Sequence, residues 1–375
     1  MNSHSDPSLR TEILQGEKNI LGIGYDWDDL FARATEASPH LSYAWAKTFL
    51  EERRFHGTPL CVLVWSEQKL VALLPLVVRR ILNKRLAEPV GAGQPSYLGL
   101  LLDSNFPSAI REIVTLFKQK MVADMLCINS LWSEDKATNK LVDELREQGF
   151  LCLKTYRNPC YSITLGPSFE EYLNKTISSR RRRELKRNEK KILELGAVDF
   201  EEYSGNDITD ALIRRMASLQ EESWMKRREC AVLSQPFYRK LLVGMSNAGF
   251  GHAWFVKING SDAAFGFGYV AHRRFYYEWT AFKLTYEPAL SVGKVLTSWL
   301  IKDVCKKGLM SFDFGHGEGW YKQFWANECN SVYRIVVAQG LVARILAALY
   351  FVVFWLGKRK PIYSVYHRLN RTRDN

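Results

Sequence analysis

One order of secondary-structure elements is predicted twice along this chain, and it limits the fold more than any single motif does. In the first copy, two β-rich runs within residues 60–80 flank a polar turn at 66–69, a pattern typical of a hairpin. A stretch rich in glycine and proline, a helical pattern and an apolar strand pattern follow it, over residues 91–107, 108–120 and 125–132.

The second copy begins near residue 252. It opens with a hairpin over Asn259-Gly260, because Asn-Gly favours the tight turn that joins antiparallel strands. A third strand, an irregular stretch, a helix over 291–308 and a strand over 310–316 follow. A chain of 375 residues is long enough for two domains. We therefore expect an α/β fold with mixed (α+β) sheets, built as tandem domains from a duplicated unit.

A strongly basic segment lies between the two copies. Residues 180–191 carry eight basic and two acidic side chains, so they hold 8 − 2 = +6 of the chain's formal charge of +12. The apolar residues around them follow one helical stripe, and a glycine follows as a stop: Leu173, Ile177, Leu185, Ile192, Leu195 and Gly196. We expect a basic bridging helix with one packed face and one face exposed to an anionic partner.

These patterns divide the chain into five segments. They are a flexible N-terminus (1–25), an N-terminal domain (26–165), the basic bridging helix (166–198), a C-terminal domain (199–338) and an apolar helix with a basic tail (339–375).

Cysteine usage and the ends of the chain bear on location. The seven cysteines are scattered, without a CxxC pair or a Cys/His cluster of zinc spacing, which favours a reducing compartment and no metal. The polar N-terminus lacks the apolar core of a secretory signal. The apolar run 345–356 is shorter than the ~20 residues that span a bilayer. We expect a cytoplasmic protein, with this run either buried or lying on the inner membrane face beside its basic tail.

The segment 286–301 predicts a phosphate site. A loop leads into Gly293 and then into an amphipathic helix, whose free N–H groups and positive dipole end suit a phosphate. Gly293 permits close approach of the backbone, and Lys294 adds charge. The alternative is a simple N-cap by Ser291. The first copy has Pro107 and Ser108 at the corresponding helix start but no glycine.

A second candidate site is the glycine-rich loop after the last strand of the second copy. Asp313 ends an apolar strand, three glycines enclose His316 and Glu318, and Tyr321 and Lys322 follow. In α/β proteins, loops at the carboxyl ends of strands often carry the chemistry. The alternative is a turn whose charges are merely solvated.

Taken together, these motifs resemble the CelD/BcsL-type acetyltransferases of cellulose biosynthesis. These proteins are a branch of the GNAT superfamily that shares a tandem-domain plan with FemAB-type aminoacyl transferases. The resemblance covers roughly residues 26–335 and rests on "WDDLF", "LVALLPLVVRR", "LELG", "LQEESWMKRRE", "SDAAFGFGYV", "PALSVGKVL" and "FDFGHGEGWYKQFW". Two positions depart from the family pattern: Val292 replaces the proline of Ser-Pro-Gly, and His316 stands where arginine is frequent.

The resemblance implies acyl transfer from acyl-CoA or acetyl-CoA, or from an acyl carrier protein, to an amine or hydroxyl. The acceptor would be a saccharide or lipid-linked group of the envelope or of an exopolysaccharide. The carrier's phosphates would bind at Ser291, Val292, Gly293 and Lys294. The catalytic candidates are Glu278, Asp313, His316 and Glu318 as proton acceptors, Tyr321 as proton donor and Lys322 as an oxyanion donor. Trp224, Trp279 and Trp320 are candidates for substrate binding.

Three other functions remain open from the sequence. A nucleic-acid-binding protein would need aromatic residues among the arginines for base stacking, and residues 173–199 contain none. A FemAB-like transferase would use aminoacyl-tRNA and would bind it through the basic helix. A non-catalytic, membrane-peripheral subunit of a polysaccharide-synthesis complex would dock through residues 341–375.

Overall fold

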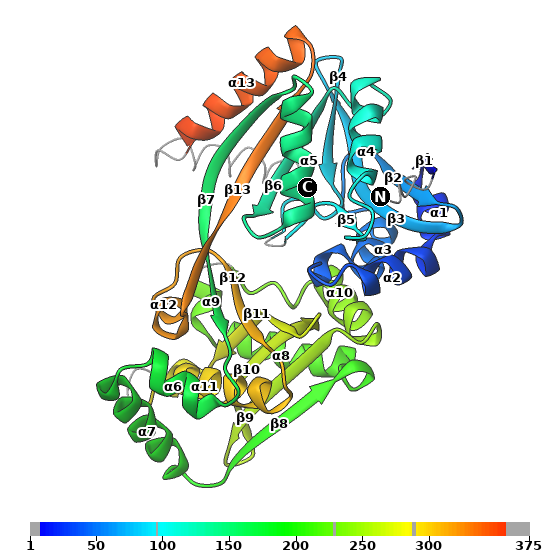
Figure 1. The fold of residues 1–375 in the computed structure, drawn as a ribbon. Coiled ribbons are helices and arrows are strands. Elements are labelled where there is room, and N and C mark those ends of the chain that lie inside the picture. Colours follow the sequence, from blue (N-terminus) through cyan, green and yellow to red (C-terminus); the bar gives the residue numbers. More distant parts are fainter. Residues whose placement is uncertain (1–7, 95–96, 228–229, 287–289, 358–375) are drawn as a thin grey trace, which may run out of the picture.

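The computed structural model describes residues 8–94, 97–227, 230–286 and 290–357. Its strands join into a single 13-stranded mixed sheet in the order β1-β2-β3-β4-β6-β13-β7-β12-β11-β10-β9-β8, with β5 beside β3 (Figure 1). The strands are β1 (Leu9–Gln15), β2 (Thr58–Ser66), β3 (Lys69–Ile81), β4 (Lys84–Pro89), β5 (Leu101–Leu102), β6 (Met125–Trp132), β7 (Leu151–Thr164), β8 (Val198–Ser204), β9 (Gly251–Ile258), β10 (Ser261–Ala271), β11 (Arg274–Phe282), β12 (Ser311–His316) and β13 (Glu328–Ala338).

Helices cover both faces of this sheet (Figure 1). They are α1 (Glu17–Leu21), α2 (Gly24–Arg33), α3 (Tyr43–Glu51), α4 (Ala109–Lys118), α5 (Lys136–Glu147), α6 (Phe169–Thr176), α7 (Ser179–Leu193), α8 (Asp210–Glu221), α9 (Trp224–Arg227), α10 (Pro236–Asn247), α11 (Val292–Lys306), α12 (Trp320–Trp325) and α13 (Leu341–Gly357). The expected α/β architecture is confirmed.

The predicted duplication is present in the strand pairing. Each half has a hairpin, β2–β3 or β9–β10, then a third strand, a helix and a fourth strand that runs parallel to the third. In the second half, β11 pairs with β12 only over Arg274–Tyr276, so the remainder of β11 diverges from its neighbour. Sequence reasoning missed the third strand of the first half, β4, because its charged and proline residues do not alternate with apolar ones.

Two long strands tie the halves together. β7 pairs with β12 of the second half through Ser162–Thr164, and β13 pairs with β7 along its length and also with β6 of the first half. The chain therefore passes between the halves twice, as Figure 1 shows. The expected domain limit at residue 338 assigns β13 to the second half, whereas its hydrogen bonds also join it to the first.

The N-terminal segment differs from the prediction. Residues 9–15 form β1, which pairs with β2 from Leu9↔Ser66 to Gln15↔Leu60, and α1 follows. The expected flexible N-terminus (1–25) is therefore wrong for residues 9–21. β1 pairs with the edge of β2. Without β1, this edge would expose unpaired backbone groups that could pair with another chain.

The basic bridge is two helices instead of one. α6 ends at Thr176, and α7 begins at Ser179 with the Ser178 hydroxyl accepting a hydrogen bond from the Arg181 N–H. A residue whose side chain caps a new helix N-terminus interrupts a helix that would otherwise continue. Ile177, Leu185 and Ile192 are buried as expected.

The core shows how the halves support each other. Helices α2 and α3 of the first half and α8 and α10 of the second contribute to one apolar cluster, which includes Trp27, Phe49, Leu242, Phe265 and Tyr269. On the other face of the second half, α11 and α7 pack over β9 to β12. Burial of this continuous apolar surface favours a fixed relation between the halves.

The helix over the apolar run, α13, packs two alanines, Ala343 and Ala347, against the β6 and β13 side of the sheet. No helix in the described part of the chain is both long and apolar enough to cross a bilayer. The predicted basic tail, from Lys358 onward, lies outside the described residues.

Candidate active site

A cavity of about 110 Å³ lies where β11 and β12 diverge. Its walls come from β11, from the glycine-rich loop after β12, from α12 and, unexpectedly, from the first half of the chain. They comprise His40, Tyr97, Tyr276, Tyr277, Glu278, Trp279, Thr280, Asp313, Phe314, Gly315, His316, Tyr321 and Lys322. The structure thus brings together five of the six predicted catalytic residues and Trp279.

The loop that closes this cavity depends on glycine. Gly315 and Gly317 have φ values of +68° and +105°, a region that other residues rarely adopt. These two residues turn the chain from β12 into α12, whose first turn directs Tyr321 and Lys322 into the cavity.

Asp313 is completely buried. Its Oδ1 accepts hydrogen bonds from the Gly315 N–H (2.7 Å) and the Tyr97 hydroxyl (3.0 Å), and its Oδ2 lies 3.5 Å from Arg274 Nη1. Burial raises the pKa of this carboxyl, and the Arg274 guanidinium opposes that rise. The carboxylate therefore holds the glycine loop, a tyrosine of the first half and β11 in one arrangement.

Glu278 has a different environment. Its Oε1 lies 3.0 Å from His40 Nε2, and its side chain is 13% exposed. His40 Nδ1 accepts a hydrogen bond from the Tyr97 N–H (3.4 Å), so the neutral imidazole carries its proton on Nε2 and donates it to Glu278. Sequence reasoning missed His40 because it lies 238 residues from Glu278 and belongs to no motif.

Lys322 and Tyr321 supply donors to the same cavity. Lys322 Nζ donates to the carbonyl oxygens of Gly315 (3.2 Å) and His316 (3.1 Å), and an ammonium group has a third N–H to offer. Burial lowers the pKa of Lys322, while the Asp313 carboxylate opposes this. Burial raises the pKa of Tyr321 to about 12, so its hydroxyl keeps its proton near neutral pH.

His316 is neutral near pH 7. Burial above all, and then the positive charges of Arg157 and Lys322, lower its pKa from 6.5 to about 4. Its Nδ1 lies 3.3 Å from Asn158 Nδ2, while its buried Nε2 has no hydrogen-bond partner among the described residues.

This depressed pKa predicts a loss of stability in mild acid. Below pH 6.5 the unfolded chain protonates this histidine and the folded chain does not, so the free energy of unfolding falls as the pH drops from 6.5 toward 4. Between pH 7 and pH 5 this contributes about 2 kcal/mol. Urea unfolding of the wild type and His316→Asn at both pH values measures it. Since burial also lowers the pKa of His252 and His272, the wild-type-minus-variant difference is the relevant quantity. An identical pH dependence in both proteins would contradict the prediction.

The predicted phosphate loop is at the start of α11. Ser291 occupies the N-cap position in the left-handed conformation (φ 50°, ψ 48°), and its side chain makes no capping hydrogen bond with any described residue. The alternative of a simple N-cap by Ser291 is therefore wrong. A Cβ at Gly293 would lie 2.8 Å from the Phe282 ring, so packing on β11 also requires this glycine.

Lys294 links this helix start to α7 and α12. Its Nζ lies 2.8 Å from Glu184 Oε1 and 5.2 Å from the centre of the Trp320 ring. Trp320 is 67% exposed and stands beside the helix start instead of in the cavity. Because the Val292 side chain is buried, only the backbone of this residue can face a ligand.

Two other predicted residues lie elsewhere. Glu318 is exposed and accepts hydrogen bonds from the Tyr161 hydroxyl (3.4 Å) and Gln323 Nε2 (3.3 Å). Trp224 begins the short α9 and is not among the described residues that line the cavity. The described part of the chain holds no group of three or more His, Cys, Asp or Glu side chains placed to bind a metal ion.

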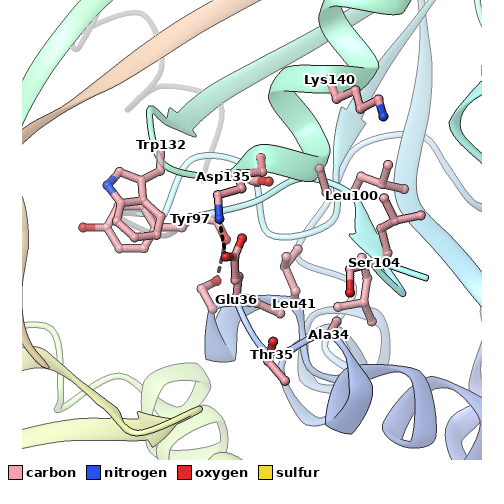
Figure 2. A pocket seen from close by; sticks show the side chains of 16 residues that line it. Ala34, Thr35, Glu36, Leu41, Tyr97, Leu100, Ser104, Trp132, Asp135 and Lys140 are labelled. Atoms are coloured by element: carbon pink, nitrogen blue, oxygen red, sulfur yellow. Dashed lines mark hydrogen bonds and ion pairs between the residues drawn. The ribbon is translucent and has the colours of Figure 1, made fainter. Parts of the chain in front are cut away.

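A larger cavity, about 280 Å³, lies in the first half (Figure 2). Tyr97 lines both cavities: it stacks on Trp132 at 5.4 Å in the larger one, and its hydroxyl reaches Asp313 in the smaller one. Glu36 and Tyr97 both line this cavity (Figure 2), and Lys136 Nζ lies 2.5 Å from Glu36 Oε1. The two cavities therefore share Tyr97 as a lining residue.

Part of the second half matches a known protein family. Residues 179–323 match a family model described as "Acetyltransferase (GNAT) domain", a span that includes α7, α11, β12 and most of α12. A comparison with curated proteins gives no match.

Two solved structures are similar in fold. The crystal structure of FemX shares 12% identity with a TM-score of 0.59, over 83% of this chain and 95% of FemX. The C-terminal domain of a putative lysylphosphatidylglycerol synthetase from Agrobacterium fabrum shares 10% identity with a TM-score of 0.54, over 89% of this chain and 96% of that domain. The second half of the chain thus contains a GNAT acetyltransferase domain, and this domain identifies the protein as an acyltransferase.

Proposed function

We propose that the protein transfers an acyl group from acyl-CoA to an amine or hydroxyl in the cavity between β11 and β12. One observation supports this most: Glu278, Tyr321 and Lys322 share a cavity whose wall strand, β11, continues to the start of α11, where Phe282 packs on Gly293. A thioester whose carrier is bound at that helix start can thus extend along β11 toward the three side chains.

The chemistry assigns one role to each side chain. Glu278 accepts the proton of the attacking amine or hydroxyl as the new bond to the thioester carbon forms. The third N–H of Lys322 stabilises the carbonyl oxygen while it carries negative charge. The carbon–sulfur bond then breaks, and the Tyr321 hydroxyl gives its proton to the departing thiolate. Asp313 holds the loop that positions Lys322.

The helix start would bind the carrier's diphosphate. Backbone N–H groups of Val292 and Gly293 have no acceptor within the first turn of a helix, and the helix dipole favours an anion there. Lys294 lies beside them. We place the acceptor on the side of the larger cavity, which the first half of the chain supplies.

The donor site predicts a binding defect in Gly293→Leu. The added side chain would cover the backbone N–H groups and strike Phe282, so affinity for CoA should fall at least about tenfold, which isothermal titration calorimetry measures. Phe282→Ala/Gly293→Leu is the control, because it removes the steric conflict but still covers the N–H groups. Recovery of binding in this double variant, or no heat with the wild type, would refute the site.

Aminoacyl transfer from aminoacyl-tRNA is the second candidate. Seven basic residues on α7 are exposed: Arg180, Arg181, Arg183, Lys186, Arg187, Lys190 and Lys191. The Glu184–Lys294 pair places this helix against the start of α11. The basic residues of α7 would attract a polyanionic donor to that position. One similar fold is named as the C-terminal domain of a putative lysylphosphatidylglycerol synthetase. Parallel assays with acetyl-CoA and aminoacyl-tRNA as donors distinguish the two candidates.

The narrower CelD/BcsL-type assignment, and with it a saccharide or lipid-linked acceptor of the envelope, remains a prediction from the sequence resemblance. A panel of amino sugars, polysaccharide hydroxyls and lipid amines offered with the established donor tests it.

A further inference from the structure

Helix α13 has two distinct faces. Ala343 and Ala347 are buried against the sheet, with Leu346 and Tyr350 partly buried beside them. The opposite face is apolar and exposed to solvent: Leu341 (76%), Val342 (52%), Ile345 (52%), Leu349 (56%) and Val352 (47%). The spacing of these five residues follows the helical repeat, so they form one stripe along the helix.

This apolar stripe is not a normal surface for a protein in water. Single exposed apolar side chains are common, but a continuous row of five large ones on one helix marks a contact surface. The small alanines on the packed side let the helix lie close to the sheet. The large apolar side chains lie on the outer face. Figure 1 shows α13 on the outside of the molecule, beside β7 and β13.

The charge around the stripe indicates what covers it. The sequence of α13 contains Arg344 and no acidic residue. The chain that follows, residues 358–375, carries six basic and one acidic side chain, 6 − 1 = +5. A second copy of this chain also carries a formal charge of +12, so a dimer through this surface would bring like charges together. A surface that is both apolar and anionic would instead complement the apolar stripe and the basic residues.

We propose that α13 docks the protein on the surface of an anionic lipid membrane. The helix would lie in the plane of the interface, with the apolar stripe in the boundary between headgroups and acyl chains and with the basic residues after it against the headgroups. The helix does not qualify as a membrane span, which agrees with a surface position. This inference is independent of the acyl-transfer chemistry proposed above.

Vesicle co-sedimentation of the full chain tests the proposal. The vesicles are pure phosphatidylcholine, or phosphatidylcholine with about a third phosphatidylglycerol, at low and high salt. Ile345→Gln/Leu349→Gln removes two exposed side chains of the stripe without touching the core. Tyr25→Gln/Leu193→Gln is the matched control, because it removes two exposed apolar side chains from α2 and α7 (Figure 1).

The wild type and the control are expected to bind the anionic vesicles, and the α13 variant to bind at least about tenfold more weakly. High salt should weaken wild-type binding because it screens the basic residues. Three outcomes would overturn the proposal. They are no wild-type binding, equal loss in the α13 variant and the control, and a wild-type dimer that the α13 variant converts to a monomer without any vesicle binding.

Discussion

Replacing Glu278 by glutamine is expected to lower kcat/KM for acyl transfer by a factor of about 10²–10⁴, the range over which a general base contributes. An amide of the same shape cannot accept the nucleophile's proton. His40 Nε2 can still donate a hydrogen bond to the amide oxygen, so the side chain should keep its position. Binding of CoA, which depends on the start of α11, should be unchanged.

The measurement follows release of free thiol from acetyl-CoA with each acceptor of the panel, together with thermal unfolding. Glu318→Gln is the matched control, since this exposed glutamate lies on the glycine-rich loop beside the cavity and does not line it. His40→Ala should lose less activity than Glu278→Gln, because it disturbs only the position of the carboxylate. Normal activity in Glu278→Gln combined with a large loss in Glu318→Gln would reverse the assignment of the base.

The sequence predicted those parts of the site that are local in the chain. The hairpin over Asn259-Gly260, the helix start at Gly293 and the strand ending near Asp313 each have a periodic pattern or a turn residue within a short window. The glycine-rich loop motif identified four predicted residues of the cavity, Asp313, His316, Tyr321 and Lys322, because they are close together in sequence.

The remainder depends on contacts that no local pattern encodes. His40 and Tyr97 reach Glu278 and Asp313 across 238 and 216 residues, and they do so because the two halves share one core. The pairing of β13 with both β7 and β6 is also long-range. The proposed acid and base groups of the site come from the second half, whereas its positioning groups come from both halves. Motifs of the second half alone therefore identify only part of the site.

Among the predicted catalytic residues, Asp313 has the contacts most typical of a residue that stabilises the fold. Its carboxylate is completely buried and accepts hydrogen bonds from the Tyr97 hydroxyl, the Gly315 N–H and the Cys160 thiol. It also faces Arg274, whose guanidinium lies 4.6 Å from the centre of the Trp132 ring. Asp313→Ala would leave that half-buried cation without its partner, so we expect the free energy of unfolding to fall by about 3 kcal/mol. Urea denaturation followed by circular dichroism and tryptophan fluorescence measures this loss.

Two further variants separate the charge from the hydrogen bonds. Asp313→Asn keeps an acceptor for the Tyr97 hydroxyl and the Gly315 N–H, so it should lose less stability than Asp313→Ala and retain measurable acyl transfer. In Arg274→Met/Asp313→Ala the unpaired cation is gone, and stability should recover part of the loss, because removing both members of a buried ion pair costs less than removing one. A loss below about 1 kcal/mol in Asp313→Ala would show that water or other groups compensate Arg274. Full stability with abolished activity in Asp313→Asn would instead return Asp313 to the reacting groups, since the loss of activity could then not be a consequence of lost stability.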